Sequence, residues 1–313
     1  MQLIRNLHNC RPDGQRGCVL TIGNFDGVHC GHQALLARAC AVAAKYHVLS
    51  VVMTFEPQPL EFFAPERRVP RLTRFREKYC HLATTGVDRL FVVRFDQQFA
   101  ALSPTAFVET ILCERLGAGH IIVGDDFQFG NARQGNVTLL QTLGKHYGFS
   151  VEIMPSVQIA GERVSSTRVR KALQAADHVL VERLLGRPYT MMGRVVYGNQ
   201  LGRILGFPTA NIYLHRQATP VQGIYAVRLH GITSQGLTGV ANVGTRPTIG
   251  GTRTLLEVYL FDFNQTIYGK YVTVEFCKKL REEERFDTLE LLRKQMVIDA
   301  EQAKAYFADN ETA

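Results

Sequence analysis

The stretch Gly23-Asn24-Phe25-Asp26-Gly27-Val28-His29-Cys30-Gly31-His32 decides the fold of the N-terminal half through what lies on either side of it. The apolar run 19–22 precedes the stretch and predicts a buried strand, and a helical pattern over 33–45 follows it. A strand that turns directly into a helix is the building unit of an α/β sheet, where ligands bind beyond the carboxyl ends of strands. The stretch therefore predicts a ligand-binding loop at the edge of a parallel sheet.

The alternation of strand and helix continues to about residue 185. Apolar runs at 48–55, 90–95, 121–123 and 150–153 predict further buried strands. The segment 104–116 predicts a helix, with Ser103 as its N-cap and Pro104 at the first helical position. This order indicates a Rossmann-like, doubly wound parallel sheet.

The pattern of predicted secondary structure changes after Pro188. Short β segments separated by glycines and turn residues are predicted at 191–197, 223–229, 236–243, 255–261 and 271–276. They indicate a small antiparallel barrel, followed by a C-terminal helix with Asp287 and Glu290 as a capping box. We place the first domain at residues 1–185 and the second at 186–313.

Composition narrows the class of protein. The chain has 313 residues, 46% of them hydrophobic, which is enough for two cores, and no apolar run approaches the roughly 18 residues of a membrane helix. Because no signal-peptide core opens the chain, we expect a cytoplasmic protein that does not bind membranes. The seven cysteines include no C-x-x-C pair and predict buried or idle thiols. The net charge of +8 suits nucleic acid or polyphosphate ligands, and the dispersed basic residues favour polyphosphates and no nucleic acid.

The opening stretch carries candidates for nucleotidyl transfer. His29 and His32 lie at a helix entrance, where both would donate hydrogen bonds to charge that develops on an α-phosphate. A lone histidine is more often structural, but the surrounding glycine-containing loop favours the functional interpretation. The nucleotide- and flavin-binding candidates of this loop are Gly23, Asn24, Phe25, Asp26 and Gly27.

A second segment would complete this site. The hydroxyls of Ser165, Ser166 and Thr167 precede a helical stretch, where they either cap the helix or help to bind a triphosphate. Arg163 and Arg170 flank them with forked donors that suit phosphate oxygens.

The segment 124–130 follows another predicted strand. Its Asp126 is a candidate for orienting a substrate hydroxyl or ring. Phe127 and Phe129 either line an aromatic pocket or pack as the core of a turn.

The C-terminal half contains no P-loop, and a different glycine-rich loop takes its place. Backbone amides of such a loop meet phosphates, and hydroxyl and amide oxygens after it suit Mg²⁺; the alternative is a plain β-turn. The ATP-binding candidates are Gly198, Gly202, Gly206, Pro208, Thr209 and Asn211, of which Thr209 and Asn211 are also the metal candidates.

Phosphoryl transfer to an alcohol needs a residue that orients or deprotonates the alcohol, and Glu257 is the candidate. It lies in an apolar predicted strand, on the same face as Leu255 and Tyr259, a face that we expect to point into the barrel. Glu275 and the charged run 281–285 are interpreted as solvated surface.

Taken together, these motifs resemble the bacterial bifunctional riboflavin kinase/FMN adenylyltransferases, or prokaryotic FAD synthetases, over nearly the whole chain. The matching segments also include 54–57, 185–189, 244–248 and 268–269. The resemblance implies an H-x-G-H nucleotidyltransferase domain and a six-stranded barrel kinase domain. It implies ATP as co-substrate of both reactions, Mg²⁺ as cofactor, and riboflavin, FMN and FAD as ligands.

The resemblance also implies residue roles. Residues matching Thr209 and Asn211 bind Mg-ATP, and the residue matching Glu257 is the kinase base. FMN adenylylation is assigned to positions His29, His32, Asp126, Arg163, Ser166, Thr167 and Arg170. The chain departs from the family at Gln58 and Tyr259, where histidine is usual, which bears on substrate affinity.

Three other functions stay open at this point. The chain would be a nucleotidyltransferase for another phosphate ester, such as phosphopantetheine, with a barrel that only binds flavin. It would otherwise be a flavin- or nucleotide-sensing binding protein, or, least favoured, a nucleic-acid binder. The intact histidine loop, the hydroxyl segment and Glu257 favour the bifunctional enzyme.

Overall fold

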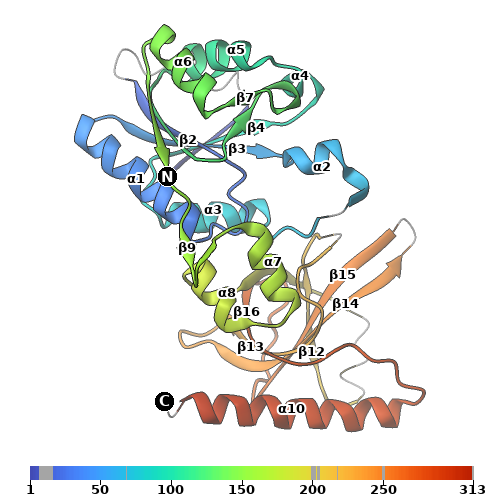
Figure 1. Cartoon of the computed structure of the whole chain (residues 1–313). Helices are drawn as coiled ribbons and strands as arrows, with labels where there is room; N and C mark the ends of the chain where they lie inside the picture. Colours follow the sequence, from blue (N-terminus) through green and yellow to red (C-terminus); the bar gives the residue numbers. More distant parts are fainter. Residues whose placement is uncertain are drawn as a thin grey trace. The chain divides into compact units, whose positions relative to one another are not determined.

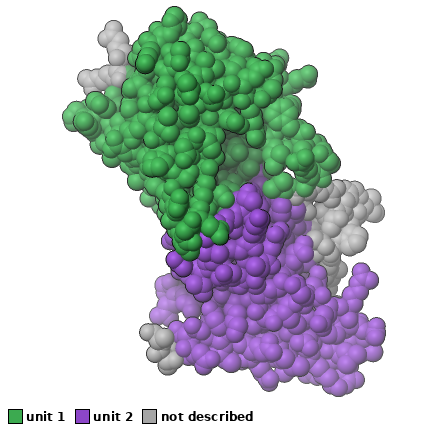
Figure 2. Space-filling model, in the orientation of Figure 1, with its two compact units in different colours: residues 1–69, 73–166 green, residues 70–72, 167–313 purple. Residues whose placement is uncertain are grey.

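The computed structural model describes residues 1–6, 17–67, 69–198, 202, 205–216, 218–248 and 251–311. The chain divides into two compact units (Figure 2), residues 1–69 with 73–166 and residues 70–72 with 167–313. Among the described helices, none has both the length and the apolar character to cross a membrane.

Unit 1 is built on a six-stranded sheet in which every strand is parallel to its neighbours (Figure 1). The strand order is β1-β4-β3-β2-β5-β8. The strands are β1 (Gln2–Arg5), β2 (Cys18–Ile22), β3 (Leu49–Glu56), β4 (Arg89–Arg94), β5 (Ala118–Gly124) and β8 (Ser150–Met154). The predicted parallel sheet is confirmed, but the edge strand β1 was not predicted, because its side chains are mostly exposed and form no apolar run.

Helices cover both faces of this sheet. On one face, Leu36 and Ala39 of α1 (Cys30–Tyr46) and Leu82 of α3 (Phe75–Ala83) pack against the strands. The predicted helix at 104–116 begins with α5 (Pro104–Ala106), capped by the Ser103 side chain, and continues as a π-helix, η3 (Phe107–Arg115). The remaining short elements are α2 (Pro59–Phe63), η2 (Pro65–Arg67), α4 (Gln97–Ala100) and η4 (Asn131–Arg133), with the hairpins β6 (Gln128–Phe129)–β7 (Gly135–Asn136) and β9 (Gln158–Ile159)–β10 (Glu162–Arg163).

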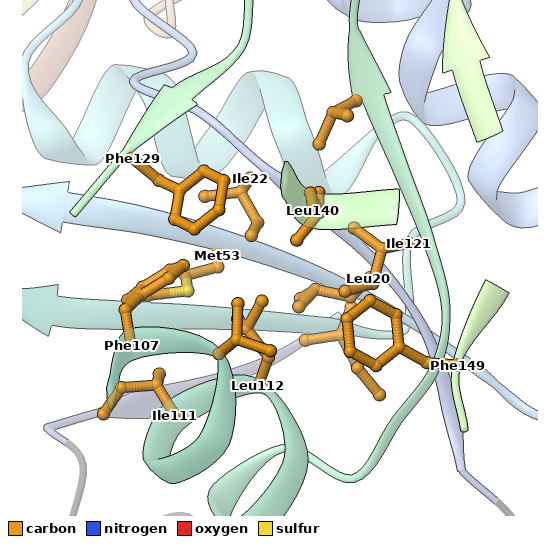
Figure 3. Packing of buried hydrophobic residues seen from close by; sticks show 14 of the residues in the cluster. Leu20, Ile22, Met53, Phe107, Ile111, Leu112, Ile121, Phe129, Leu140 and Phe149 are labelled. Carbon is orange, nitrogen blue, oxygen red and sulfur yellow. The ribbon is translucent and has the colours of Figure 1, made fainter. Parts of the chain in front are cut away.

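The opposite face of the sheet holds the larger core cluster (Figure 3). Leu20 and Met53 of the sheet meet Phe107 and Leu112 of η3 and Leu140 of α6 (Val137–Tyr147). Because hydrophobic cores cover both faces of the sheet, ligands are expected to bind at the loops that follow the strand ends.

The strand order reverses next to β2. After β2 the chain adds β3 and β4 on one side and then returns to place β5 on the other side of β2. In open α/β sheets, ligands bind at the carboxyl ends of strands at such a switch point. The segments after β2 and β5 are those predicted to bind the nucleotide.

Unit 2 contains α7 (Ser166–Gln174) from its second residue on, α8 (His178–Leu185), and a closed barrel whose strands are all antiparallel to their neighbours. The order around the barrel is β11-β12-β15-β14-β13-β16. The strands are β11 (Thr190–Val196), β12 (Thr209–Tyr213), β13 (Gly223–His230), β14 (Leu237–Thr248), β15 (Gly251–Leu260) and β16 (Tyr271–Arg281). The six-stranded barrel is confirmed, and β12 is a strand that the sequence patterns did not predict.

The long helix α10 (Leu289–Glu311) covers part of the outer face of the barrel (Figure 1). Ala300, Ala303 and Phe307 pack there against Ala226 and Phe261. The expected capping box is wrong, because the helix begins one residue later than Asp287 would require: the Thr288 Oγ1 accepts a hydrogen bond from the Leu291 N–H at 3.2 Å.

The charged run before α10 is only partly a solvated surface. Residues 282–285 are exposed, as expected. Arg281, however, forms two hydrogen bonds of 2.8 Å with the Asp299 carboxylate of α10, and Glu275 pairs with His230 at 2.9 Å. The interpretation of Arg281 and Glu275 as solvated surface was wrong, because each is partly buried against a long-range partner that local sequence does not reveal.

Candidate active sites

His29 and His32 lie together at the start of α1. His29 is the N-cap of the helix, and its Nδ1 accepts a hydrogen bond from the His32 N–H at 3.3 Å. The two rings stack with centroids 3.6 Å apart, and the Phe25 ring lies 5.0 Å from that of His32. Gly31 lets the ring of His29 pack closely, because a Cβ at position 31 would lie 3.2 Å from that ring. Both predicted histidines are thus at one helix N-terminus.

His32 is held neutral by its surroundings. Part of the residue remains accessible, but its Nδ1 is buried and has no hydrogen-bond partner among the described residues. Burial lowers the pKa of His32 well below its usual value, and the nearby His29 and Lys78 lower this pKa further. A neutral imidazole keeps one N–H, which can donate a hydrogen bond to a ligand.

Lys78 of α3 is a buried charge that the sequence patterns did not reveal. Its side chain is fully buried, and its Nζ lies 3.5 Å from the Glu56 Oε1 at the end of β3. A charge in such surroundings is normally paired, as it is here. The ammonium group of Lys78 adds positive potential near His32, which contributes to the lowered pKa of that residue.

Two buried hydrogen bonds and one partly buried hydrogen bond hold the loop after β2. The Gly27 N–H donates to the Thr73 Oγ1 at 2.9 Å, and the Thr73 N–H donates to the Asp26 Oδ1 at 2.9 Å. The Ser166 Oγ donates to the Asp26 carbonyl oxygen at 2.8 Å. Asp26, only 2% exposed, therefore braces the loop, and Thr73 is a supporting residue that no local motif indicates.

The backbone of the same loop adopts unusual conformations. Phe25 and Val28 have φ angles of 47° and 43°, in the left-handed region that bulky residues avoid, and Gly27 has 82°. Both bulky side chains are fully buried, so packing holds the strained backbone in place. Gly23 and Asn24 are tied to β3 by hydrogen bonds from the Gly23 N–H to the Met53 carbonyl oxygen and from the Thr54 Oγ1 to the Asn24 carbonyl oxygen.

The structure brings together two candidates that lie far apart in the sequence. The Arg163 NH2 of β10 lies 2.7 Å from the Asp126 Oδ2, just beyond β5. Both side chains are about half exposed or more, at the end of the strand that flanks the switch point. The hydrogen bond to Asp126 raises the pKa of Arg163, and a hydrogen bond from Ser156 lowers the pKa of Asp125.

The two phenylalanines of segment 124–130 differ in their surroundings. Phe129 is only 6% exposed and belongs to the core cluster, whereas Phe127 is partly buried and stacks on it with ring centroids 5.5 Å apart. The interpretation as packed turn residues therefore holds for Phe129.

The remaining candidates of this half have the following positions. Ser165 is half-buried, and Ser166 begins α7. Thr167 and Arg170 belong to unit 2, where the Arg170 Nε donates to the Pro70 carbonyl oxygen at 2.7 Å. Gln58, a departure from the family pattern, is 8% exposed at the N-cap of α2, and its Nε2 has no partner among the described residues.

The glycine-rich loop of the barrel is described in part, because residues 199–201 and 203–204 lie outside the described residues. The Phe207 N–H donates to the Gly202 carbonyl oxygen at 2.7 Å, and Gly206 has a φ of 87°, which requires glycine. A Cβ at Gly198 would overlap the amide of Asn211, so glycine at 198 makes room for that side chain. Pro208 leads directly into β12, which carries Thr209 and Asn211.

Glu257 lies in a polar row that crosses three strands. In the strand register it is paired with Asn211 of β12 on one side and with Asn242 of β14 on the other. Tyr259, two residues along, is paired with Thr209 and Val240. Both metal candidates and the proposed base therefore share one strand face, and the row of Glu257 adds Asn242, which the sequence patterns did not single out.

This face is the outer face of the barrel, and the expected inward orientation of Glu257 is wrong. Leu256 and Val258 are fully buried on the opposite face, while Tyr259 packs in the cluster formed with α10. The Phe207 ring meets the Tyr259 ring at 5.0 Å. Alternation groups the right residues but does not tell which face of a strand is buried by the barrel.

Metal-binding groups are sparse in the part of the chain that the structure describes. No group of three or more His, Cys, Asp or Glu side chains is placed there to hold a metal ion, and none of the six described cysteines forms a disulfide. Cys10 lies outside the described residues. The side-chain oxygens of Thr209 and Asn211 on neighbouring positions of one strand face are hard ligands that suit a cation shared with a nucleotide.

Family models match both halves of the chain. A model described as FAD synthetase matches residues 11–168, and one described as riboflavin kinase matches residues 185–307.

Individual relatives cover the chain almost completely. It is 48% identical over 307 residues to the bifunctional riboflavin kinase/FMN adenylyltransferase of Escherichia coli strain K12, covering 98% of both chains. It is 49% identical over 309 residues to the protein of that name from Pseudomonas fluorescens, again covering 98% of both. A solved structure described as a macrolide-efflux protein from Streptococcus pneumoniae is 31% identical, with a TM-score of 0.79, covering 96% of this chain and 97% of that one. That likeness shows a shared fold across both halves.

Proposed function

The chain belongs to the bifunctional riboflavin kinase/FMN adenylyltransferases, and from this premise we propose which of its residues carry each reaction. The barrel half phosphorylates riboflavin to FMN with ATP, and the parallel-sheet half adenylylates FMN to FAD. We place the boundary between the two catalytic domains after residue 185, and we assign the enzyme to the cytoplasm.

In the kinase reaction, the 5′-hydroxyl oxygen of riboflavin attacks the γ-phosphorus of ATP. A new O–P bond forms, the bond to the β-phosphate bridging oxygen breaks, and ADP leaves. Glu257 orients the hydroxyl and takes its proton. The observation that carries this assignment is the register that sets Glu257 directly beside Asn211 on one barrel face.

Thr209 and Asn211 are the residues that would hold Mg²⁺ together with ATP. Mg²⁺ commonly keeps few protein ligands and takes the rest from phosphate and water, which fits the two neutral oxygen donors on this strand. When bound, the ion would neutralise charge on the transferred phosphoryl group. Backbone amides around Gly198, Gly202 and Gly206, before Pro208, are proposed to face the phosphates.

In the adenylyltransferase reaction, an oxygen of the FMN phosphate attacks the α-phosphorus of ATP, and pyrophosphate leaves. The nucleophile is already anionic, so the protein contributes placement and charge stabilisation. His29 and His32 donate to the phosphates at the start of α1, where free N–H groups also favour anions. The stacked, helix-terminal arrangement of these two rings supports the assignment.

The other adenylyltransferase candidates have supporting or binding roles. Asp126 and Arg163 form one charged pair, which we propose contacts the flavin phosphate or nucleotide. Asp26 and Ser166 brace the loop of Gly23, Asn24, Phe25 and Gly27. Ser165, Thr167 and Arg170 are proposed as further triphosphate-binding residues at the start of α7.

Two substitutions test whether each half of the chain carries out its own reaction. Glu257→Gln is expected to reduce FMN formation roughly 10²-fold or more and to leave adenylylation of added FMN unchanged. His32→Ala is expected to reduce FAD formation by about 10²-fold and to leave the kinase intact. FMN and FAD are followed chromatographically after mixing with riboflavin, ATP and Mg²⁺. Glu284→Gln and His146→Ala, both at exposed positions, are the matched controls. Equal loss of both activities in either active-site variant contradicts the assignment.

A further inference from the structure

In the polar row on the barrel's outer face, Asn242 is the residue for which no function has been proposed above. Asn242 of β14 is the direct cross-strand partner of Glu257, on the side away from Asn211. The adjacent outer-face position of the same strand, Val240, belongs to the apolar cluster under α10. Asn242 is therefore a polar side chain at the edge of an apolar surface, next to the proposed base.

The amide of Asn242 is incompletely paired. Its Oδ1 is buried and has no hydrogen-bond partner among the described residues. Native proteins seldom leave a buried acceptor unpaired, because it has lost its water without gaining a partner. At a substrate site, such an acceptor is explained if the bound substrate donates the missing hydrogen bond to it.

In-line transfer fixes the side on which the substrate lies. The attacking oxygen stands between the donor phosphorus and its own carbon, so the carbon chain leads away from ATP. With ATP on the Asn211 side of Glu257, the chain of the alcohol runs toward Asn242. Side chains on directly opposed strand residues lie roughly 5 Å apart at Cβ, close enough to bind neighbouring oxygens of one molecule.

We propose that Asn242 accepts a hydrogen bond from the 4′-hydroxyl of riboflavin while Glu257 holds the 5′-hydroxyl. This inference rests on the proposed role of Glu257. Asn242 thereby selects an acceptor with vicinal hydroxyls over a simple primary alcohol. The next outer-face position on β14 is consistent with a polyol: the Glu283 carboxylate occupies the space that a side chain at Gly244 would fill, which continues the line of acceptors.

The test compares riboflavin with riboflavin that lacks the 4′-hydroxyl. Asn242→Leu is expected to lower kcat/KM for riboflavin about tenfold or more and to change that for the deoxy analogue less than about twofold, because only riboflavin loses a bond. Thr238→Val, on the same face of the same strand, is the matched control and is expected to change neither. Urea unfolding of each variant reports whether the barrel is folded, because FMN adenylylation belongs to the other half of the chain.

Two outcomes would overturn the inference. An equal loss with both substrates in Asn242→Leu assigns Asn242 a structural role only. Asn242→Asp keeps an acceptor and is expected to retain the preference for riboflavin; equal use of both substrates by this variant also contradicts the proposal. Glu257→Gln is assayed in parallel. If this variant still forms FMN, the assignment of Glu257 as the base is wrong. The comparison of the two substrates still tests the hydrogen bond of Asn242 in that case.

Discussion

The rings of His29 and His32 stack almost parallel, with centroids 3.6 Å apart and 15° between their planes. Two imidazolium rings at that separation would repel each other, so the stacking opposes a charge on His32. Burial, His29 and Lys78 all lower the pKa of His32. The site therefore presents hydrogen-bond donors that are set in place by the fold, while the helix N-terminus and Lys78 supply positive potential.

The depressed pKa of His32 predicts an acid-sensitive fold. In the unfolded chain a histidine takes up its proton near pH 6.5, whereas His32 in the folded protein takes up its proton only at a lower pH. The unfolded state then binds more protons, so this contribution to stability is present above about pH 6.5 and is lost as the pH falls toward the folded pKa. His32→Gln is expected to show a smaller decrease in the free energy of unfolding between pH 7 and pH 5, measured by urea unfolding at each pH.

A residual decrease is expected in that variant, because burial also lowers the pKa of His178. His146→Gln, at an exposed helix position, serves as control and is expected to follow the wild-type curve. If His32→Gln loses as much stability on acidification as the wild type, His32 is not the group responsible.

The hydroxyl of Thr73 predicts a loop-specific defect. Thr73→Val keeps the side-chain shape but removes the acceptor of the buried Gly27 N–H. We expect a stability loss of about 1–3 kcal/mol and slower FMN adenylylation with an unchanged kinase. Thermal unfolding and the two activities measured separately check this, with Thr142→Val at an exposed position of α6 as control. A kinase defect as large as the adenylylation defect would argue against a local role.

The close approach of Asn211 to Gly198 predicts a defect in the kinase reaction that leaves FMN adenylylation unchanged. In Gly198→Ala the new methyl group takes the space of the Asn211 amide and displaces it from the row beside Glu257. FMN formation is expected to fall at least about tenfold, with a raised KM for Mg-ATP, since the displaced amide is the proposed ligand. FAD formation from added FMN is expected to persist. Gly119→Ala, where a Cβ has ordinary contacts only, controls for the glycine change.

Long apolar runs made most of the fold predictable from sequence. The strands β2, β3, β4 and β5 lie inside the parallel sheet, so both of their faces are largely buried and their apolar runs are continuous. The strand β8 is an edge strand and only half-buried, but its run at 150–153 was long enough to predict it. By contrast, β1 is a short, exposed edge strand, and β12 has five residues that begin directly after Pro208. Neither carries a run long enough to distinguish it from a loop.

The proposed active-site residues divide by the range of the interactions that define their positions. His29 and His32 are three residues apart on one helix turn, so a local motif reveals them. Thr73 and Asn242 act through partners 46 and 15 residues away, Gly27 and Glu257, and only the topology brings each pair together. The face of Glu257 was mistaken for the same reason, since it depends on how the barrel closes and where α10 packs.

The link between Arg281 and Asp299 predicts how the last helix is held to the barrel. Both hydrogen bonds measure 2.8 Å, and the side chains are only 17% and 4% exposed. Asp299→Leu leaves Arg281 buried without its carboxylate and is expected to cost about 3–5 kcal/mol of unfolding free energy.

The double variant Arg281→Met/Asp299→Leu removes both charges and is expected to be more stable than Asp299→Leu alone, because replacing a whole buried pair by apolar side chains is far less costly than breaking it. Urea unfolding of the four proteins completes the double-mutant cycle. Exposed Lys294 and Glu290, paired at 2.9 Å on the same helix, supply the control cycle, where a coupling below about 1 kcal/mol is expected. Strictly additive losses at Arg281 and Asp299 would show that α10 is held by its apolar contacts with the barrel instead.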